Sequence, residues 1–349
     1  MKNPYLEICN RLVGIDYEPL VVVEIGINHE GSLKTAKELV LAAKAAGAEV
    51  IKHQTHIPDA EMSIEAQYVI PGNTNESIYD VISRCSLSAE EEFELADYVN
   101  SLDLIYISTP FSFEAIEVLN DIGIPAFKIG SGECNNYPFV KKVAEKGKPV
   151  ILSTGMNSIS SIRPSVEILR EEGVQFALLH CTNLYPTPDN LIRLDAIREL
   201  GVEFSDAVLG LSDHSLSNYP CLGSVALGAS ILERHFTDSK LRPGPDIICS
   251  MTPSELEVLI EGSKVIWKSS RGSKRPLPEE NVTIKFAFSS VVARRCLEPG
   301  HIITLEDITL KRPAGGDFGP KDYFNLIGRR VSERIEANTQ VKKRSLASG

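Results

Sequence analysis

Residues 20–28 read Leu-Val-Val-Val-Glu-Ile-Gly-Ile-Asn, and this run decides the fold. A near-continuous apolar run is typical of a strand buried on both faces, as in a parallel sheet. After it, Ser32 can cap a helix whose apolar residues recur at helical spacing as far as Gly47. A second run, Glu-Val-Ile-Lys-His-Gln-Thr, follows at residues 49–55. A strand, a helix and a strand in such a short span predict a βαβ unit.

The same alternation continues along the chain. Further strands are predicted at 104–109, 125–130, 149–154, 175–180, 207–212 and 230–235, with helices between most of them, for example at 88–101, 112–121, 137–146 and 158–172. About eight βα repeats in roughly 250 residues predict an α/β protein with a (β/α)8 TIM barrel. A doubly wound open sheet is the alternative. It would carry a Gly-x-Gly-x-x-Gly fingerprint after its first strand, and residues 26–31, Gly-Ile-Asn-His-Glu-Gly, lack that spacing.

Two irregular segments interrupt this pattern. Residues 56–86 form a long insertion after the second strand, which would lie over the mouth of a barrel as a lid. Residues 271–283 have the composition of a linker. We therefore predict a barrel domain over residues 1–270, this linker, and a small, mostly β domain over residues 284–349. Short strands and turns are predicted in that tail at 291–293, 298–303, 307–310 and 336–339.

Composition excludes several classes of function. The net charge is -11, from 36 basic and 47 acidic residues, and no basic run is present, so neither nucleic acid nor an anionic membrane is an expected partner. No apolar run approaches the ~20 residues that span a bilayer, and the N-terminus carries no basic-then-apolar signal. The seven cysteines are scattered, without Cys-x-x-Cys spacing. We therefore predict a cytoplasmic protein without a disulfide framework or a thiolate zinc site.

Polar residues gather where the predicted strands end. They are Glu24, Lys52, Gln54, Thr109, Lys128, Glu133, Ser153, His180, Asn183, Ser212, Asp213, His214, Glu233 and His235. The carboxyl ends of the strands are where barrels carry their chemistry. Because side chains alternate faces along a strand, residues two apart, such as Lys52 and Gln54, point the same way. If these side chains point into the lumen of the barrel, they converge on one site.

The types of these residues indicate two kinds of ligand. His214 and His235 should end neighbouring strands, where they are able to share one divalent ion such as Mn2+, with Asp213 as a possible partner in the next shell. Lys52 and Lys128, with the surrounding hydroxyls and amides, suit a phosphorylated anion, which a Gly-Ser-Gly turn at residues 130–132 lets approach the backbone. A lysine imine remains an alternative. Glu24 and Glu133 are acid/base candidates, or glutamates that simply neutralise the lysines.

Several ordered motifs together closely resemble bacterial sialic acid synthases, the N-acetylneuraminate synthase family. They are Val23-Glu-Ile-Gly-Ile-Asn-His-Glu-Gly31, Val50-Ile-Lys-His-Gln-Thr55, Phe127-Lys-Ile-Gly-Ser-Gly-Glu133, Leu152-Ser-Thr-Gly-Met156, His180-Cys-Thr-Asn183, Gly210-Leu-Ser-Asp-His214 and Glu233-Arg-His-Phe236. The tail, with Lys311-Arg312-Pro313 and Gly315-Gly316-Asp317-Phe318, is similar to that family's antifreeze-like (SAF, β-clip) domain. The resemblance covers nearly the whole chain.

The resemblance implies a metal-dependent condensation of phosphoenolpyruvate with open-chain N-acetylmannosamine and water, giving N-acetylneuraminate and phosphate. The implied ligands of phosphoenolpyruvate are Lys52, Thr109, Lys128, Ser131, Ser153, Asn183 and Ser212. The implied ligands of Mn2+, or of Mg2+ or Co2+ in its place, are His214 and His235. The implied ligands of the sugar are Glu24, Gln54, Asn73, Tyr185 and Asp246. Glu133 is implied as the leading acid/base residue, with Glu24 and Lys52 as the other catalytic candidates.

The resemblance also implies a domain-swapped homodimer, in which the antifreeze-like domain of one subunit caps the barrel of the other and Arg312 reaches the partner's sugar. Three alternatives stay open. The first is a legionaminic or pseudaminic acid synthase that uses a 2,4-diacetamido-2,4,6-trideoxy hexose. The second is a Schiff-base pyruvate aldolase, and the third is a non-catalytic binding protein.

Overall fold

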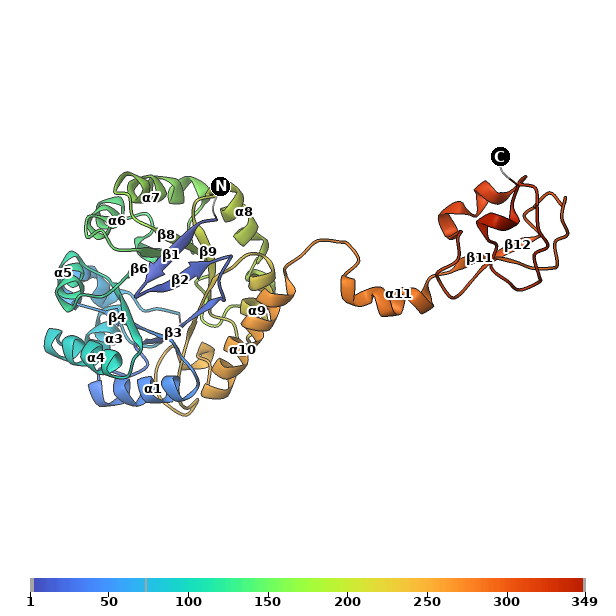
Figure 1. Cartoon of the computed structure of the whole chain (residues 1–349). Coiled ribbons are helices and arrows are strands. Elements are labelled where there is room, and N and C mark those ends of the chain that lie inside the picture. Colours follow the sequence, from blue (N-terminus) through green and yellow to red (C-terminus); the bar gives the residue numbers. More distant parts are fainter. Residues whose placement is uncertain (1–2, 73, 348–349) are drawn as a thin grey trace. The chain divides into compact units, whose positions relative to one another are not determined.

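The computed structural model describes residues 3–72 and 74–347. The chain forms two compact units, residues 1–271 and residues 272–349. The first unit contains a closed ring of eight parallel strands in the order β10-β3-β4-β5-β6-β7-β8-β9, which confirms the predicted TIM barrel (Figure 1). The strands are β3 (Leu20–Gly26), β4 (Val50–Thr55), β5 (Ile105–Pro110), β6 (Phe127–Ile129), β7 (Val150–Ser153), β8 (Phe176–Cys181), β9 (Val208–Asp213) and β10 (Ile231–His235).

Helices surround this ring and pack their apolar faces against its outer surface. They are α1 (Leu33–Ala45), α4 (Ala89–Ser101), α5 (Phe113–Ile122), α6 (Tyr137–Ala144), α7 (Ile159–Glu171), α8 (Asp195–Glu203), α9 (Tyr219–Ala226) and α10 (Pro253–Ser269). Ser32 caps α1 as predicted, since its side chain accepts a hydrogen bond from the backbone N–H of Thr35. The main hydrophobic core lies between strands and helices and joins residues such as Val23, Leu39 and Phe127.

The lumen of the barrel is apolar toward the amino ends of the strands. A second buried cluster there includes Leu20 and Val22 of β3, Val50 of β4 and Ile231 of β10. Continuing each strand in steps of two residues leads from these side chains to polar ones, because alternate residues share a face. On β3 the sequence is Leu20, Val22, Glu24, and on β10 it is Ile231, Glu233, His235. The apolar layers therefore seal one end of the lumen and leave the polar layer at the other.

A hairpin that the sequence reading did not predict precedes the barrel. It consists of β1 (Tyr5–Ile8) and β2 (Arg11–Gly14), paired antiparallel. Leu6, Ile8 and Val13 join the apolar lumen cluster, and the N–H of Glu7 donates to Oε1 of Gln175, which directly precedes β8. The hairpin therefore covers the amino end of the barrel lumen.

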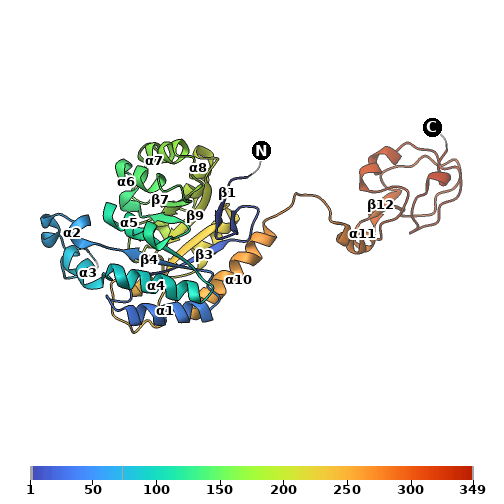
Figure 2. The same cartoon turned by 60° about the vertical axis from the view of Figure 1, so that its left-hand side comes forward.

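The insertion after β4 forms three short helical pieces, α2 (Pro58–Glu61), the 3-10 helix η1 (Ile64–Tyr68) and α3 (Ile78–Cys85). Figure 2 shows α2 and α3 beyond the carboxyl end of β4, where the sequence predicts a lid. The phenol of Tyr79 on α3 donates to Oδ1 of Asp59 on α2, which ties the two helices together. Asn73, a predicted sugar ligand in this insertion, lies outside the described residues.

The second unit contains the 3-10 helix η5 (Pro278–Glu280), α11 (Asn281–Ala287) and the antiparallel pair β11 (Ser290–Ala293) and β12 (Ile308–Lys311). Short 3-10 helices complete it, η6 (Pro320–Asp322), η7 (Phe324–Leu326) and η8 (Lys343–Ser345). Of the short strands and turns predicted in this tail, the segments 298–303 and 336–339 contain no strand among the described residues. The first contributes only an isolated bridge at Ile302, and the second is a turn in which Asn338 has a φ of 61°.

This unit has its own hydrophobic core, which includes Val291, Ile308 and Val331. Among the described residues of the whole chain, no helix is both long enough and apolar enough to cross a membrane.

Candidate active site

The polar layer of the lumen opens into a cavity of about 140 Å3 at the carboxyl ends of the strands. Its lining comes from every strand of the barrel or from the loop that follows it, and comprises Glu24, Lys52, Gln54, Thr109, Phe111, Lys128, Gly130, Ser131, Gly132, Ser153, Cys181, Asn183, Tyr185, Ser212, His214, Glu233 and His235. All the residues predicted to hold phosphoenolpyruvate and both predicted metal ligands are among them. The convergence inferred from strand alternation is therefore present in the structure.

Three predicted site residues in the described part of the chain are not among the lining residues. Glu133 is half-buried in the 3-10 helix η2 (Ser131–Glu133), and its Oε2 accepts a hydrogen bond from Nδ2 of Asn136 at 2.6 Å. Asp246 is buried, with Oδ2 3.7 Å from Nδ1 of His235. Arg312 is exposed directly after β12 in the second unit.

Two lysines and two glutamates form the charged centre of the cavity. Nζ of Lys52 lies 2.7 Å from Oε2 of Glu24 and 3.7 Å from Oε1 of Glu233. Nζ of Lys128 lies 3.8 Å from the same Glu233 oxygen. All four side chains are buried, and removing charges from water is costly unless they are paired. Glu233 therefore bridges the two lysines, while Glu24 pairs with Lys52 alone.

This arrangement separates the proton affinities of the two carboxyls. Burial raises the pKa of Glu24 above its ordinary value, although Lys52 opposes the shift. Burial acts in the same direction on Glu233, but Lys128 and Lys52 outweigh it and lower its pKa. Burial lowers the pKa of Lys128, whereas at Lys52 the two glutamates outweigh burial and raise the pKa. Of the two carboxyls, Glu233 is consequently the one that favours the ionised form, and Glu24 is the one better suited to hold a proton.

Hydroxyl groups surround the two ammonium groups. Nζ of Lys128 donates to Oγ of Ser153 at 2.7 Å, and Nζ of Lys52 donates to Oγ1 of Thr109 at 3.3 Å. The N–H of Gly155 donates to Oγ of Ser131 at 3.0 Å. Cations, hydroxyls and a glycine-rich turn in one cavity are the groups that bind phosphate and carboxylate oxygens.

His214 and His235 extend from the neighbouring strands β9 and β10, with ring centroids 5.4 Å apart. Burial lowers the pKa of His214 to about 4 and that of His235 to about 3, so both rings are neutral near pH 7. Nδ1 of His214 lies 3.1 Å from the carbonyl oxygen of Thr182 and must donate to it, which leaves Nε2 with a free lone pair. A neutral imidazole whose other nitrogen donates to a carbonyl is the usual form of a metal-binding histidine.

The donor set fits a divalent ion only with help from further ligands. Within residues 3–72 and 74–347, no group of three or more His, Cys, Asp or Glu side chains is placed to hold a metal ion. Asp213 does not assist His214 as the sequence suggested: its Oδ2 lies 3.3 Å from Nε of Arg234 and accepts from Oγ of Ser215. Two histidines leave open positions for water or substrate oxygens, which suits Mn2+ and similar ions.

The sequence reading assigned no role to three lining residues. Glu233 lies at the end of a predicted strand, and its two-residue spacing from His235 is the signal for a lumen position. Phe111 and Cys181 carried no such signal, since an aromatic ring or a thiol near a strand end is ordinarily a packing residue.

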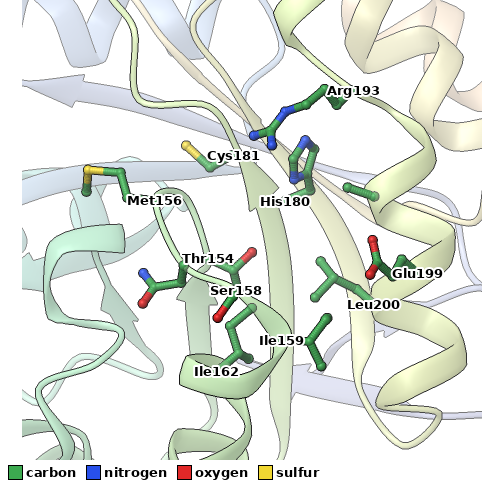
Figure 3. A pocket seen from close by; sticks show the side chains of 12 residues that line it. Thr154, Met156, Ser158, Ile159, Ile162, His180, Cys181, Arg193, Glu199 and Leu200 are labelled. Carbon is green, nitrogen blue, oxygen red and sulfur yellow. The ribbon is translucent and has the colours of Figure 1, made fainter.

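A larger cavity of about 500 Å3 lies beside this site, between α7 and α8 (Figure 3). Its floor is apolar, with Ile162 and Leu200, and Arg193 is the one basic group of its lining besides His180. Nε2 of His180 donates to the carbonyl oxygen of Ile192 at 2.6 Å. The two lysines, their glutamates and the pair of histidines from β9 and β10 converge in the smaller cavity, which is therefore the candidate active site.

Comparisons with known proteins identify relatives of this chain. A family model described as the NeuB family matches residues 39–275, and one described as the SAF domain matches residues 288–347. The chain is 35% identical to the N,N'-diacetyllegionaminic acid synthase of Campylobacter jejuni, over 93% of this chain and 99% of that protein. It is 30% identical to the N-acetylneuraminate-9-phosphate synthase of Homo sapiens, over 96% and 95%. The N-acetylneuraminic acid synthetase of Leptospira borgpetersenii, solved with citrate, superposes with a TM-score of 0.74 at 27% identity, over 81% and 95%.

Proposed function

The chain belongs to the NeuB family of sugar-acid synthases and ends in a SAF domain, and from this premise we propose that it condenses phosphoenolpyruvate with an N-acetylated amino sugar. The enol carbon of phosphoenolpyruvate bonds to the aldehyde carbon of the open-chain sugar. Water adds to the carbon that carries the phosphate, and the C–O bond to phosphate breaks. The products are a nine-carbon keto acid and inorganic phosphate. The observation that carries this proposal is the pair of buried lysines around one ionised glutamate in a hydroxyl-lined cavity.

Lys52 and Lys128 are the groups proposed to hold the phosphate and carboxylate of phosphoenolpyruvate, together with Thr109, Ser131 and Ser153. Both ammonium groups are already held in place by hydroxyls, so little reorganisation is needed when an anion arrives. The negative charges of the ligand, Glu233 and Glu24 together would exceed the positive charge of the two lysines. Protonation of one carboxyl would reduce this excess. Because its pKa is raised by burial, Glu24 is the better suited of the two carboxyls to take up that proton.

Glu24 is then the group proposed to carry a proton to the aldehyde oxygen as the new bond forms. Its Oε1 accepts a hydrogen bond from Nε2 of Gln54, a predicted sugar ligand, at 2.6 Å. Glu133, which the family resemblance places first as acid/base, is not a lining residue, so its role stays a prediction from the resemblance. A divalent ion held by His214 and His235 would polarise the aldehyde and make its carbon more electrophilic.

Two sugars are candidates for the acceptor. N-acetylmannosamine is the sugar that the sequence motifs imply. A 2,4-diacetamido-2,4,6-trideoxy hexose is supported by the higher identity to a diacetyllegionaminic acid synthase, 35% against 30% for the N-acetylneuraminate-9-phosphate synthase. Both have the aldehyde and the N-acetyl group next to it, so the proposed chemistry is the same for either.

The deciding experiment measures phosphate release from phosphoenolpyruvate in the presence of Mn2+, with each sugar in turn and with the product mass read alongside. Release with N-acetylmannosamine and a mass of N-acetylneuraminate would support the first sugar. Faster release with a diacetamido sugar would support the second. If folded protein releases phosphate with neither, the proposed condensation is wrong, and trapping of Lys128 by pyruvate with borohydride would then test the aldolase alternative.

A further inference from the structure

A buried histidine at the start of the insertion is joined to the active site by hydrogen bonds that the proposed reaction does not use. Nδ1 of His56 lies 3.0 and 3.1 Å from the two carboxylate oxygens of Glu61 on α2. Its Nε2 lies 3.1 Å from Oε1 of Gln54. Gln54 in turn donates from Nε2 to Oε1 of Glu24 at 2.6 Å. One chain of hydrogen bonds therefore runs from the insertion to the carboxyl that is proposed to move the proton.

The direction of each bond in this chain follows from which atoms are able to donate. Gln54 presents its NH2 group to Oε1 of Glu24 at 2.6 Å, and while that oxygen carries no proton, the carbonyl oxygen of Gln54 would meet a second acceptor there. The amide oxygen of Gln54 then faces His56 and accepts from Nε2. Glu61 accepts from Nδ1. Both ring nitrogens of His56 donate in this arrangement when the ring is an imidazolium paired with the Glu61 carboxylate. The donation from Nε2 then determines which way the Gln54 amide is turned.

His56 is itself held firmly. Its side chain is 3% exposed, and its ring stacks on Phe111, a lining residue of the cavity, with centroids 4.2 Å apart and planes 15° apart. The Glu61 side chain is 7% exposed, and among the described residues its carboxylate accepts hydrogen bonds from His56 alone. A buried carboxylate without a partner is strongly disfavoured, so the position of α2 depends on this pair.

We propose that His56 is a positioning residue, which orients Gln54 and, through it, Glu24 toward the sugar, and which couples the placement of α2 to that orientation. The kinetic effects expected from this proposal rest on the proposed function. Loss of the two donated bonds should raise KM for the sugar and lower kcat, because the amide and the carboxyl are no longer fixed. KM for phosphoenolpyruvate should stay nearly unchanged, because within the described residues His56 makes its hydrogen bonds to Glu61 and Gln54 and none to the hydroxyls and lysines of that half of the cavity.

Two variants and one control test the proposal. His56→Phe keeps a flat ring against Phe111 and removes both donors. Glu61→Gln keeps the shape of the side chain and removes its charge, and it serves if His56→Phe folds poorly. Glu65→Gln is the matched control, because Glu65 is an exposed glutamate of the same insertion whose side chain bonds only to Ser63 among the described residues. We expect kcat/KM for the sugar to fall about 10- to 100-fold in both test variants and to stay unchanged in the control.

A double-mutant cycle separates positioning from a general structural role. If His56 acts through Gln54, then His56→Phe should cost less than about twofold in a Gln54→Ala background. Equal losses in both backgrounds, or a rise in KM for phosphoenolpyruvate as large as that for the sugar, would overturn the proposal.

Hydrogen–deuterium exchange gives a readout that needs no turnover. The amides of Ala60, Glu61 and Met62 donate to the carbonyls of Ile57 and Pro58, and they should exchange about tenfold faster in His56→Phe than in Glu65→Gln. Unchanged exchange would contradict the coupling to α2. If the unaltered protein turns over neither sugar, the proposed function fails, while the exchange experiment still decides whether His56 holds α2.

Discussion

The ammonium group of Lys52 lies 2.7 Å from the carboxylate of Glu24, and the two side chains are only 4% and 2% exposed. They extend from neighbouring strands, because Glu24 of β3 and Lys52 of β4 are partner residues in the sheet. The presence of a buried ion pair and the loss of one of its members have different effects on stability. Its net effect on folding is small, but removing one member leaves a charge without a partner in the lumen.

Replacing Lys52 by glutamine should therefore affect both properties. We expect kcat/KM to fall by at least about 10³-fold and the free energy of unfolding to fall by about 3 kcal/mol, since Glu24 loses its partner and the anion loses one cation. Lys37→Gln is the control, because Lys37 pairs with Glu94 at the surface and such pairs contribute less than about 1 kcal/mol. Urea unfolding and steady-state kinetics measure the two effects. Retention of more than a tenth of the activity would contradict the proposed role of Lys52.

Replacing His235 by asparagine should abolish binding of Mn2+. We expect calorimetric titration of the unaltered protein with Mn2+ to show one site per chain and His235→Asn to show none, with folding preserved. His180→Asn provides a control with another buried histidine, whose ring donates to the carbonyl of Ile192 outside the charged centre. Equal Mn2+ affinity in His235→Asn and the unaltered protein would remove the assignment of the metal site.

Gly155 should tolerate no side chain. A Cβ at this position would lie 1.8 Å from Oδ1 of Asn183 and 2.9 Å from Oγ of Ser131, both of which line the cavity. Gly155→Ala should therefore displace these side chains and raise KM for phosphoenolpyruvate at least about tenfold. At Gly223 in α9 an added Cβ meets only Cδ1 of Leu194 at 3.4 Å, an ordinary contact, so Gly223→Ala is the control and should change KM less than about twofold. Similar kinetics in the two variants would show that the close approach at Gly155 has no consequence.

Asp307 should make the second unit sensitive to acid. Burial opposes its charge, but hydrogen bonds from His301, Thr304 and Arg295 outweigh burial and hold the pKa of Asp307 well below its ordinary value. A carboxyl with a lowered folded-state pKa stabilises the fold above its ordinary pKa of about 3.9, and this contribution is lost as the pH falls below that value.

Asp307→Asn should consequently lower the stability of the unit at pH 7 by about 2 kcal/mol and remove most of this pH dependence. Hydrogen exchange of amides in β11 and β12, followed from pH 7 to pH 3 with corrections for the intrinsic rate, measures both. An unaltered protein whose protection does not decline toward pH 3 would contradict the prediction.

Subunit complementation tests the homodimer and the role of Arg312 that the family resemblance implies. Arg312→Ala and Glu24→Gln should each be inactive alone. If the C-terminal unit of one chain completes the barrel site of the other, a mixed dimer has one intact site, and random pairing gives about one quarter of the native activity. Mixed refolding of the two variants, with each variant refolded alone as the control, measures this. No recovery in the mixture would argue against a site shared between two copies.

Much of the site follows from the period of the strands. Lys52, Thr109, Lys128, Ser153, Ser212 and the two histidines were all predicted from polar residues at the ends of apolar runs, and they do line one cavity. The positions of Glu133 and Glu233 could not be predicted from strand periodicity alone. In the sequence, Glu133 follows the glycine turn and looks as well placed for the site as the other polar residues. In the structure, residues 131–133 form a 3-10 helix, and the Glu133 carboxylate accepts a hydrogen bond from Asn136. Glu233 lies between the two lysines because it shares the lumen face with His235.

The sequence by itself determined the alternation of strands and helices, the apolar and polar layers of the lumen and the set of groups available for phosphate and metal, because these depend on local periodicity and on residue type. Only the tertiary structure decided which partners those groups have. The pairing of Asp213 with Arg234, the bridging of two lysines by Glu233 and the path from Glu61 through His56 to Glu24 all join residues of different elements. Their proton affinities depend on distances of a few ångströms inside a buried lumen, and no spacing along the chain specifies such distances.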